Sequence, residues 1–322
     1  MLKGAVVGVG YLGKFHAEKY HNSKQVDLVA LVDPNPENAS KLANKFGAIY
    51  TQDYKMLPSL GVQCASISSI TSTHYEIAAW LLENGIDVLV EKPITTTIED
   101  AEKLVALAKK NNRILQVGHL ERFNPAFRAM KDVMSSPRYF EVRRIAPFSG
   151  RSFDVDVISD VMIHDLDIVA HLTGQELLKV EAVGTPVITN SYDVVSARIT
   201  FTGGAVANIT ASRTALVPER TIRIFQPDLY ISLDFGKRKL KIYRLSEEKQ
   251  NFGLFPNVDV QEIPVREEDA LQAEIDSFVN CVAERKEPEA TGQDGVRALK
   301  FANAVRAAIA EHNEKFGFLP HA

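Results

Sequence analysis

Short apolar segments alternate with longer amphipathic segments along the first 120 residues of the chain. Runs such as KGAVVGV, VDLVALVD and CASISSI are short and apolar, which favours buried strands. The segments between them, such as STHYEIAAWLLENG, have the length and spacing of amphipathic helices. Continuous apolar strands separated by helices are typical of a parallel sheet with helices on both faces. The first part of the chain therefore predicts an α/β domain.

The pattern changes to clustered strands beyond about residue 120. Runs such as DVVSARITF, AVANITASR and RTIRIFQ follow one another with turn signals between them, including TGG at 202–204. The segment 266–315 returns to a helical pattern. A chain of 322 residues is long for one domain, so we predict two. We expect 1–120 to form the parallel-sheet domain, and 121–322 an α+β domain with an antiparallel sheet and helices on one face.

The composition argues against several classes of protein. The formal net charge of −4 at pH 7 argues against a nucleic-acid-binding surface. No run of about 18 apolar residues is present, so we predict no membrane span. The apolar start MLKGAVVGVGYLG lacks a small-residue cleavage site, so we expect no targeting segment. Cys64 lies in the apolar run VQCASI and is expected to be a buried, reduced thiol, which favours a cytoplasmic protein.

A glycine loop, GVGYLG, follows the first predicted strand and opens the first predicted helix. In this context the loop predicts a dinucleotide site, because the backbone N–H groups at the helix start can bind a pyrophosphate. Asp33 ends the second strand, where a carboxylate can accept hydrogen bonds from ribose hydroxyls and repel a 2′-phosphate. This favours NAD over NADP. The alternative is that the glycines only turn the chain and Asp33 caps a helix. The expected cofactor contacts in this region are Gly8, Gly10, Tyr11, Leu12, Gly13 and Asp33.

Two further strand ends carry polar residues. The strand VLVEKP ends at Glu91 and Lys92, and ligands of open parallel sheets bind beyond the carboxyl ends of the strands. A partly desolvated lysine there can hold a substrate oxygen and relay a proton. The alternative is a surface lysine before a turn. The loop ITSTH ends another strand, so we expect Thr71, His74 and Glu91 near the cofactor, with Lys92.

The segment DVMIHDLDIV places Asp160 and His164 four residues apart, on one face of a predicted helix. From the residues alone, this pair is either catalytic or a polar stripe with an ordinary surface histidine. Asp165 and Asp167 are expected to be solvated or capping groups. No spacing of histidine, aspartate and glutamate requires a metal, so we expect none.

The combination of GVGYLGKFHA, STHYEIAAWLLENGIDVLVEKPI and Asp-x-x-x-His resembles the Gfo/Idh/MocA family of oxidoreductases. The resemblance implies an amino-terminal Rossmann domain and a second domain with a large, mostly antiparallel open sheet. It also implies that the last helices pack on the first domain. The implied activity is oxidation of a secondary hydroxyl of a sugar or polyol by a nicotinamide cofactor. His164 would take the hydroxyl proton, Lys92 would hold the hydroxyl or relay the proton, and Asp160 would bind a neighbouring hydroxyl or tune His164. The two glycines of the family pattern ahead of this pair are absent, with Asp156 and Val157 in that stretch.

The segment GHLERFNPAF resembles the branch of the family that acts on UDP-linked amino sugars. Arg122 and Asn124 are therefore expected to contact the sugar or its phosphates. A diphosphate needs cationic partners, and guanidinium groups suit phosphate geometry. Arg151, in the loop before the Asp160 helix, is the strongest of the arginines considered for this role. The other arginines considered are Arg143, Arg144 and Arg213.

Two alternatives remain open. A dehydrogenase of a free polyol such as an inositol would share the fold and the catalytic groups, and would lack basic side chains beyond the sugar pocket. A non-catalytic dinucleotide-sensing protein would not need Lys92 and His164, whose presence argues against it. An antiparallel sheet with helices on one face leaves the other face bare, so we expect a homodimer or homotetramer through that face.

Overall fold

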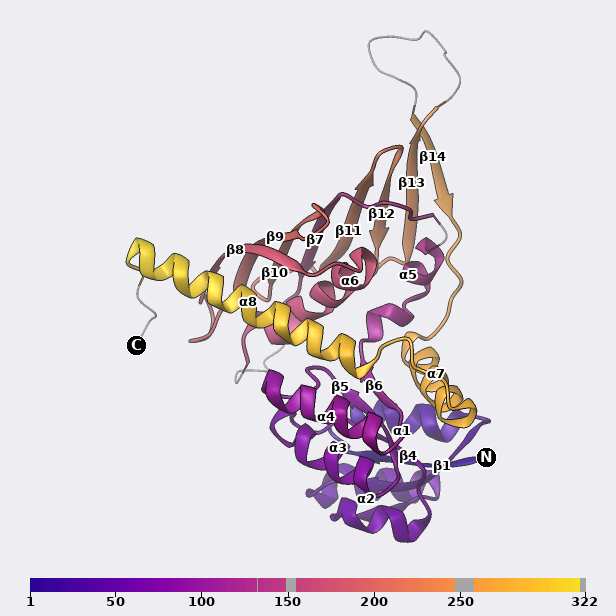
Figure 1. Cartoon of the computed structure of the whole chain (residues 1–322). Helices are drawn as coiled ribbons and strands as arrows, with labels where there is room; N and C mark the ends of the chain where they lie inside the picture. The colour runs from indigo at the N-terminus through magenta and orange to yellow at the C-terminus, as the bar shows by residue number, and fades with distance from the viewer. Residues whose placement is uncertain (132, 149–154, 247–257, 319–322) are drawn as a thin grey trace. The chain divides into compact units, whose positions relative to one another are not determined.

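The computed structural model describes residues 1–131, 133–148, 155–246 and 258–318 (Figure 1). The chain forms two compact units. Unit 1 comprises Met1–Phe123 and Asp269–Leu299, and unit 2 comprises Asn124–Glu268 and Lys300–Ala322. No helix in the described ranges has both the length and the apolarity that crossing a membrane requires.

Unit 1 is built on a parallel sheet of six strands in the order β3-β2-β1-β4-β5-β6. The strands are β1 (Leu2–Val7), β2 (Val26–Val32), β3 (Ile49–Thr51), β4 (Cys64–Ile67), β5 (Asp87–Glu91) and β6 (Leu115–Gly118). The strand order runs in opposite directions on the two sides of β1. The crevice beyond the ends of β1 and β4 is therefore the topological switch point, where ligands of open parallel sheets bind. The predicted α/β fold is confirmed.

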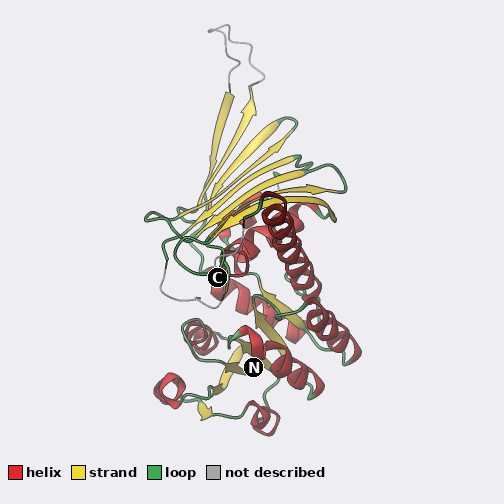
Figure 2. Cartoon of the chain, turned by 90° about the vertical axis from the view of Figure 1, so that its left-hand side faces the viewer, coloured by secondary structure: helices red, strands yellow, loops and turns green. Residues whose placement is uncertain are grey.

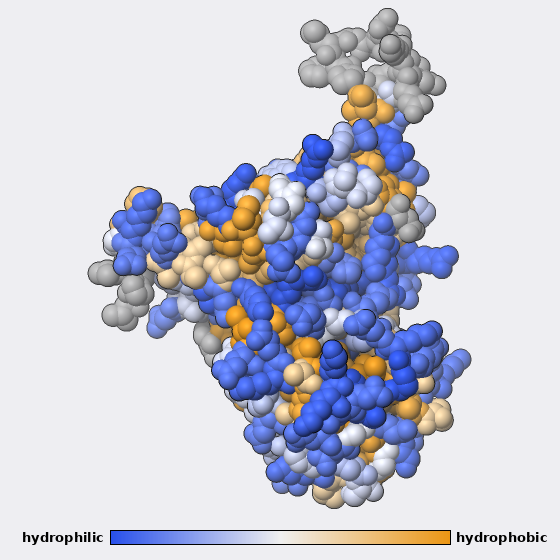
Figure 3. Space-filling model, viewed as in Figure 1, coloured by the Kyte–Doolittle hydropathy of each residue, from blue (hydrophilic) through white to orange (hydrophobic). Residues whose placement is uncertain are grey.

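Helices cover both faces of this sheet. They are α1 (Gly13–Asn22), α2 (Pro36–Phe46), α3 (His74–Glu83), α4 (Ile98–Lys110) and α7 (Ala270–Glu284), with 3-10 turns η1 (Tyr54–Leu60), η2 (Thr71–Thr73) and η3 (Leu120–Phe123). Successive side chains of β1 point to opposite faces of the sheet. Ala5 and Val7 pack with α3 and α4 on one face, and Val6 packs with α1, α2 and α7 on the other. Figure 3 shows that the visible surface of unit 1 is largely hydrophilic, as expected from the polar faces of these helices.

The local sequence explains where these helices begin and end. Asn35 caps α2 by accepting a hydrogen bond from the Glu37 N–H, and Gly47 ends that helix in the left-handed conformation at φ 71°. Thr97 caps α4 by accepting from the Asp100 N–H. The acidic residues of α4 lie in its first turn and its lysines in its last turn, as the helix dipole prefers. The sequence signals and the observed helices therefore agree.

Unit 2 contains a sheet of eight strands in the order β14-β13-β12-β11-β7-β10-β9-β8. The strands are β7 (Tyr139–Ile145), β8 (Leu177–Thr185), β9 (Val194–Phe201), β10 (Val206–Ser212), β11 (Glu219–Gln226), β12 (Leu229–Asp234), β13 (Lys239–Leu245) and β14 (Val258–Ile263). Strands β7 and β10 pair in parallel, and the other described pairs are antiparallel. The predicted mostly antiparallel sheet is confirmed.

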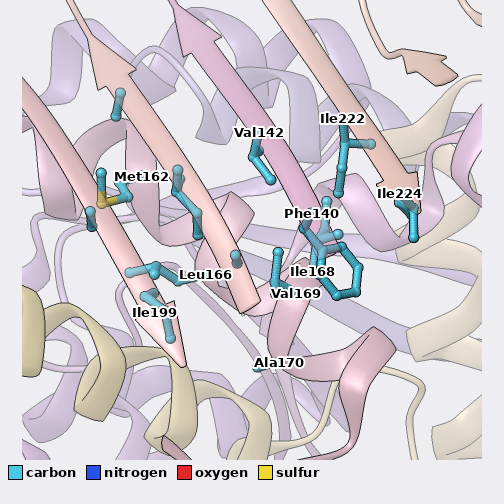
Figure 4. Packing of buried hydrophobic residues seen from close by; sticks show 14 of the residues in the cluster. Phe140, Val142, Met162, Leu166, Ile168, Val169, Ala170, Ile199, Ile222 and Ile224 are labelled. Carbon is cyan, nitrogen blue, oxygen red and sulfur yellow. The ribbon is translucent and has the colours of Figure 1, made fainter. Parts of the chain in front are cut away.

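The helices of unit 2 lie on one face of this sheet (Figure 2). They are α5 (Pro125–Met130), η4 (Ile158–Met162), α6 (Ile163–Thr173) and the carboxy-terminal part of α8 (Gly292–Phe316), which begins in unit 1. Phe140 and Val142 of β7 and Ile222 of β11 point into the same core as Leu166 and Val169 of α6 (Figure 4). The core of unit 2 therefore packs α6 directly against the middle of the sheet.

The other face of the sheet carries a row of stacked aromatic rings. Tyr139 stacks on Phe225, Phe225 on Tyr230, and Tyr230 on Tyr243, with ring centroids 5.5, 5.3 and 4.1 Å apart. All four side chains are half-buried. This row crosses four neighbouring strands, β7, β11, β12 and β13. We call it the aromatic row.

Candidate functional site

In the glycine loop between β1 and α1, Gly8 and Gly13 lie where a side chain would clash with neighbouring backbone atoms. Gly8 has φ +86°, and a Cβ there would lie 2.4 Å from the backbone nitrogen of Ser69. A Cβ on Gly13 would lie 1.8 Å from the carbonyl oxygen of Gly8. At Gly10, in contrast, a Cβ would meet no atom within 4 Å. The loop therefore folds tightly against β4 while its backbone stays open at Gly10, as a dinucleotide cradle requires.

A cavity of about 490 Å³ opens beside this loop. It is lined by Val9, Gly10, Tyr11, Lys14, Glu37, Asn38, Lys41, Leu42 and Lys45. The Asp33 carboxylate lies against the loop and accepts hydrogen bonds from the Val9 N–H at 2.7 Å and the Asn35 N–H at 2.9 Å. It thus stands at the end of β2, where the sequence predicted a ribose acceptor. The open backbone at Gly10, the start of α1 at Gly13 and the Asp33 carboxylate fit a nicotinamide dinucleotide.

The loop that follows β4 is braced by His74. Its ring nitrogens lie 2.9 Å from the carbonyl oxygen of Pro93 and 3.1 Å from that of Ser69, and the residue is 1% exposed. Burial lowers the pKa of His74, while hydrogen bonds to these backbone carbonyls oppose that shift. This placement gives His74 a structural role, and the cofactor contacts of Thr71 and His74 stay predictions.

Glu91 and Lys92 follow one another at the carboxyl end of β5. Glu91 is 8% exposed, and its carboxylate lies 3.1 Å from Nε2 of His16 on α1. The same carboxylate accepts a hydrogen bond of 3.2 Å from the backbone N–H of Lys92. Lys92 itself is half-buried. Glu91 therefore anchors the backbone from which the Lys92 side chain starts.

A second carboxyl group lies near Glu91. Glu274 of α7 is fully buried, and both of its carboxyl oxygens lack a hydrogen-bond partner in the described part of the chain. Burial, and then the nearby negative charge of Glu91, raise the pKa of Glu274 well above its ordinary value. Its surroundings therefore favour the neutral, protonated form of the Glu274 carboxyl. The sequence analysis missed it, although an acid within the apolar face of LQAEIDSFV is a signal for a buried carboxyl group.

Asp160 and His164 lie at the junction of η4 and α6 in unit 2. From Val157 to Ala170, every residue is buried except Ser159, Asp160 and His164, which are half-buried. Five residues of this junction, Ile158–Met162, form a π-helix, a rare conformation that is frequent at functional sites. Between Val157 and Ala170, the partly accessible polar side chains are therefore Ser159, Asp160 and His164, and the last two are the pair that the sequence predicted as catalytic.

The expectation for Asp165 and Asp167 was wrong. They are 1% and 2% exposed. Asp165 forms a bidentate ion pair with Arg144 of β7, with nitrogen–oxygen distances of 2.8 to 3.0 Å. The error arose because helical periodicity does not reveal a cation on a distant strand.

The arginines considered for a diphosphate have other roles in the structure. Arg144 is committed to Asp165. Arg213 is 3% exposed and bonds Asp193 at 2.7 Å and the Val155 carbonyl at 2.9 Å. Arg143 points to the face of the sheet that carries the aromatic row and pairs with Glu219. The prediction for Arg151 lies outside the described residues.

Arg122 and Asn124 both have structural roles. Arg122 is 1% exposed, donates to the Glu289 carbonyl at 2.8 Å and pairs with Asp294 at 3.1 Å, within unit 1. Asn124 caps α5 by accepting from the Ala126 N–H. For Arg122 this burial favours a structural role over the predicted substrate contact.

Comparison with known proteins agrees with this geometry. The family model "Oxidoreductase family, NAD-binding Rossmann fold" matches residues 2–119, and the GFO/IDH/MocA C-terminal domain matches residues 147–228. The chain is 36% identical to UDP-N-acetylglucosamine 3-dehydrogenase of Acidithiobacillus ferrooxidans, over 96% of this chain and 97% of that protein. The chain belongs to the Gfo/Idh/MocA family of oxidoreductases. Unit 1 thus contains the NAD-binding Rossmann domain of the family.

Other members of the family are also similar to this chain in sequence or in structure. The crystallised Acidithiobacillus enzyme GnnA matches with a TM-score of 0.90, covering 96% of this chain and 98% of that chain. The scyllo-inositol 2-dehydrogenase (NAD(+)) of Bacillus subtilis is 29% identical, over 94% of this chain and 92% of that protein. Levoglucosan dehydrogenase in complex with NADH and levoglucosan shares the fold, with a TM-score of 0.84 at 20% identity. The chain is therefore an NAD-dependent oxidoreductase of the family that acts on CH–OH groups.

Proposed function

We propose that the chain oxidises the 3-hydroxyl of a UDP-linked N-acetylamino sugar, such as UDP-N-acetylglucosamine, with NAD. The observation that carries this proposal is the 36% identity along nearly the whole chain to a UDP-N-acetylglucosamine 3-dehydrogenase. The presence of Lys92 at the end of β5 and of Asp160 and His164 at the start of α6 supports it. Each of these side chains is half-buried in its own unit.

The reaction removes one hydride and one proton from a single CH–OH group and leaves a carbonyl. Bound NAD supplies the hydride acceptor. The His164 ring takes the hydroxyl proton as general base. The Lys92 ammonium holds the hydroxyl oxygen or relays its proton, and Asp160 binds a neighbouring hydroxyl or tunes His164. In unit 1, Asp33 accepts from the ribose hydroxyls and the loop at Gly10 receives the pyrophosphate.

A second candidate is the oxidation of a free polyol. It is favoured by the 29% identity to a scyllo-inositol 2-dehydrogenase over most of the chain. The catalytic groups would be the same. Arg144 and Arg213 form internal ion pairs, so these two of the arginines considered for a diphosphate are already bound to carboxylates. The choice between the two candidates is therefore a question for a substrate panel.

The panel uses absorbance at 340 nm to follow NADH formation. We expect turnover with UDP-N-acetylglucosamine and no comparable turnover with scyllo-inositol, myo-inositol or free N-acetylglucosamine. Turnover of an inositol and of no UDP-sugar would reject the proposed substrate in favour of the second candidate. Uridine diphosphate serves as the control ligand, because it should inhibit only if the site binds the nucleotide part.

We propose further that the enzyme acts in the cytoplasm as a homodimer or homotetramer, joined through the face with the aromatic row. Cys64 supports a reducing compartment, since it is a free, fully buried thiol whose pKa burial raises to about 12. The aromatic row supports association, because aromatic side chains are enriched in protein interfaces.

A further inference from the structure

The segment just before Asp160 is held by an ion pair from the far end of the chain. Arg306 of α8 donates from Nε to Oδ2 of Asp156 at 2.7 Å and from Nη2 to Oδ1 at 2.9 Å. Such a two-pronged contact fixes direction as well as distance. The same guanidinium donates to the Ser159 hydroxyl and, from Nη1, to the Asn303 side chain at 2.8 Å. Arg306 thus holds this segment with Nε and Nη2, while its Nη1 bonds within α8.

Asp156 transmits this hold to the first residues of η4. Its Oδ1 accepts a hydrogen bond of 2.9 Å from the Ser159 N–H. Its backbone carbonyl accepts one of 3.1 Å from the Asp160 N–H. The next residue, Val157, donates its N–H to the Tyr192 carbonyl at 2.9 Å. The start of η4 is therefore fixed both by the ion pair and by the loop before β9.

The π-turn itself changes how Asp160 and His164 are aligned. Its closing hydrogen bond runs from the Ile163 N–H to the Ile158 carbonyl, five residues back. In a straight α-helix, residues four apart are offset by about 40° around the axis. Each residue of a π-turn rotates through a smaller angle, because its hydrogen bond encloses one residue more. The π-turn therefore sets an angular offset between Asp160 and His164 that differs from that of a straight α-helix.

We infer that Asp156 and Arg306 are positioning residues of this enzyme, because their ion pair fixes the π-turn that aligns Asp160 with His164. The inference rests on the proposed function for the reaction that the alignment serves. The pair acts through η4, and its loss changes the position of Asp160 relative to His164.

The first test compares turnover in variants of the pair with a matched control. The control is Arg285 in unit 1, which forms a similar ion pair of 2.7 Å with Asp87. The Arg285 side chain is 39% exposed and that of Arg306 is 31% exposed. The Asp87 side chain is 3% exposed and that of Asp156 is 13% exposed. We expect Arg306→Met and Asp156→Asn to lower kcat with UDP-N-acetylglucosamine on the order of 10- to 100-fold, since small misplacements have large effects on rate. The KM for NAD should stay unchanged. Arg306→Lys should retain more activity, and Arg285→Met should retain full activity.

The second test does not depend on turnover. Nuclear magnetic resonance follows the titration of the His164 ring, which His164→Asn identifies among the eight histidines. The midpoint should shift in Arg306→Met and Asp156→Asn, because the Asp160 charge moves relative to the ring, and should not shift in Arg285→Met. If the native enzyme oxidises no UDP-sugar, the proposed substrate fails, yet a shifted midpoint still supports the positioning role. Folded Arg306 and Asp156 variants with unchanged kcat and an unchanged His164 midpoint would overturn the inference.

Discussion

Asp33 is the residue that bears most directly on the choice of cofactor. Its carboxylate is held by the Val9 and Asn35 N–H groups and is 5% exposed, so its position is fixed before any ligand binds. A fixed negative charge at the end of β2 suits two ribose hydroxyls and repels a phosphate. The sequence predicted this role because the residue stands at a set distance from the glycine loop.

Asp33→Asn should weaken the preference for NAD. The amide keeps an acceptor for the Val9 N–H but removes the charge that repels a 2′-phosphate. We expect the ratio of kcat/KM for NAD to that for NADP to fall on the order of tenfold, about 1.4 kcal/mol. Lys109→Gln, an exposed change on α4, serves as the control. An unchanged ratio would show that Asp33 does not select the cofactor.

Glu274 affects stability in a pH-dependent way. Its folded-state pKa is raised by burial and by Glu91, whereas in the unfolded chain it titrates near its ordinary value of 4.5. Above pH 4.5 the folded state therefore holds a proton that the unfolded state has lost. Stability from this group is highest below that pH and falls as the pH rises, by up to about 1.4 kcal/mol per pH unit.

Glu274→Gln should accordingly stabilise unit 1 at pH 8 and have little effect near pH 4. Urea unfolding followed by the fluorescence of Trp80, the single tryptophan, reports on this unit. The exposed change Glu83→Gln is the control. A difference between Glu274→Gln and the native chain that does not grow with pH would contradict the assignment of a neutral buried acid.

At the scale of the element, local sequence signals located most strands and helices but not their irregularities. Apolar runs predicted core strands of unit 1, and the amphipathic segment STHYEIAAWLLENG predicted the helix α3. The three-residue strand β3 and the exposed edge strand β14 were missed, because neither shows a clear periodic pattern. The π-turn η4 was missed too, since no local motif marks it and its contact with Arg306 joins residues far apart in the sequence.

Asp193, in the loop before β9, and Arg213 form another contact between distant residues that local sequence patterns do not reveal. The Asp193 carboxylate accepts the N–H groups of Val187, Ile188 and Thr189 at 2.6 to 2.8 Å. Burial alone would raise the pKa of Asp193, but these donors and Arg213 hold it well below its ordinary value. The sequence suggested Arg213 for a phosphate, and no local pattern reveals that its partner is an internal carboxylate.

Asp193→Asn should destabilise unit 2 by about 3 to 5 kcal/mol, because it leaves the Arg213 charge buried without its partner carboxylate. Urea unfolding followed by circular dichroism measures the loss, while Trp80 fluorescence follows unit 1 separately. Glu181→Gln breaks the exposed pair with Lys179 and should leave stability nearly unchanged, because surface ion pairs contribute little. Equal effects of the two substitutions would contradict the structural role of Asp193.

At the scale of the whole molecule, the sequence predicted an α/β unit and an α+β unit from the change of pattern near residue 120. It also suggested that the bare face of the second sheet mediates association. The aromatic row gives this expectation a location, because Tyr230 is stacked between Phe225 and Tyr243 at its centre. The order of the strands in the larger sheet could not be read from the sequence, since turns do not specify which distant strands pair.

Tyr230→Asp should lower the oligomeric state. A negative charge in the middle of an apolar contact is desolvated without a partner, which opposes association. Sedimentation velocity should show a shift toward monomer for this variant and none for Lys109→Asp on α4. An unchanged assembly in a folded Tyr230→Asp variant would place the interface elsewhere.

The central proposal gives Lys92 the role of holding the substrate hydroxyl and His164 the role of taking its proton. The most direct measurement is a crystal structure of the enzyme with NADH and UDP-N-acetylglucosamine bound together. We expect Lys92 Nζ and a nitrogen of the His164 ring each to lie roughly 3 Å from the 3-hydroxyl oxygen. A bound sugar whose 3-hydroxyl is contacted by neither side chain would contradict it.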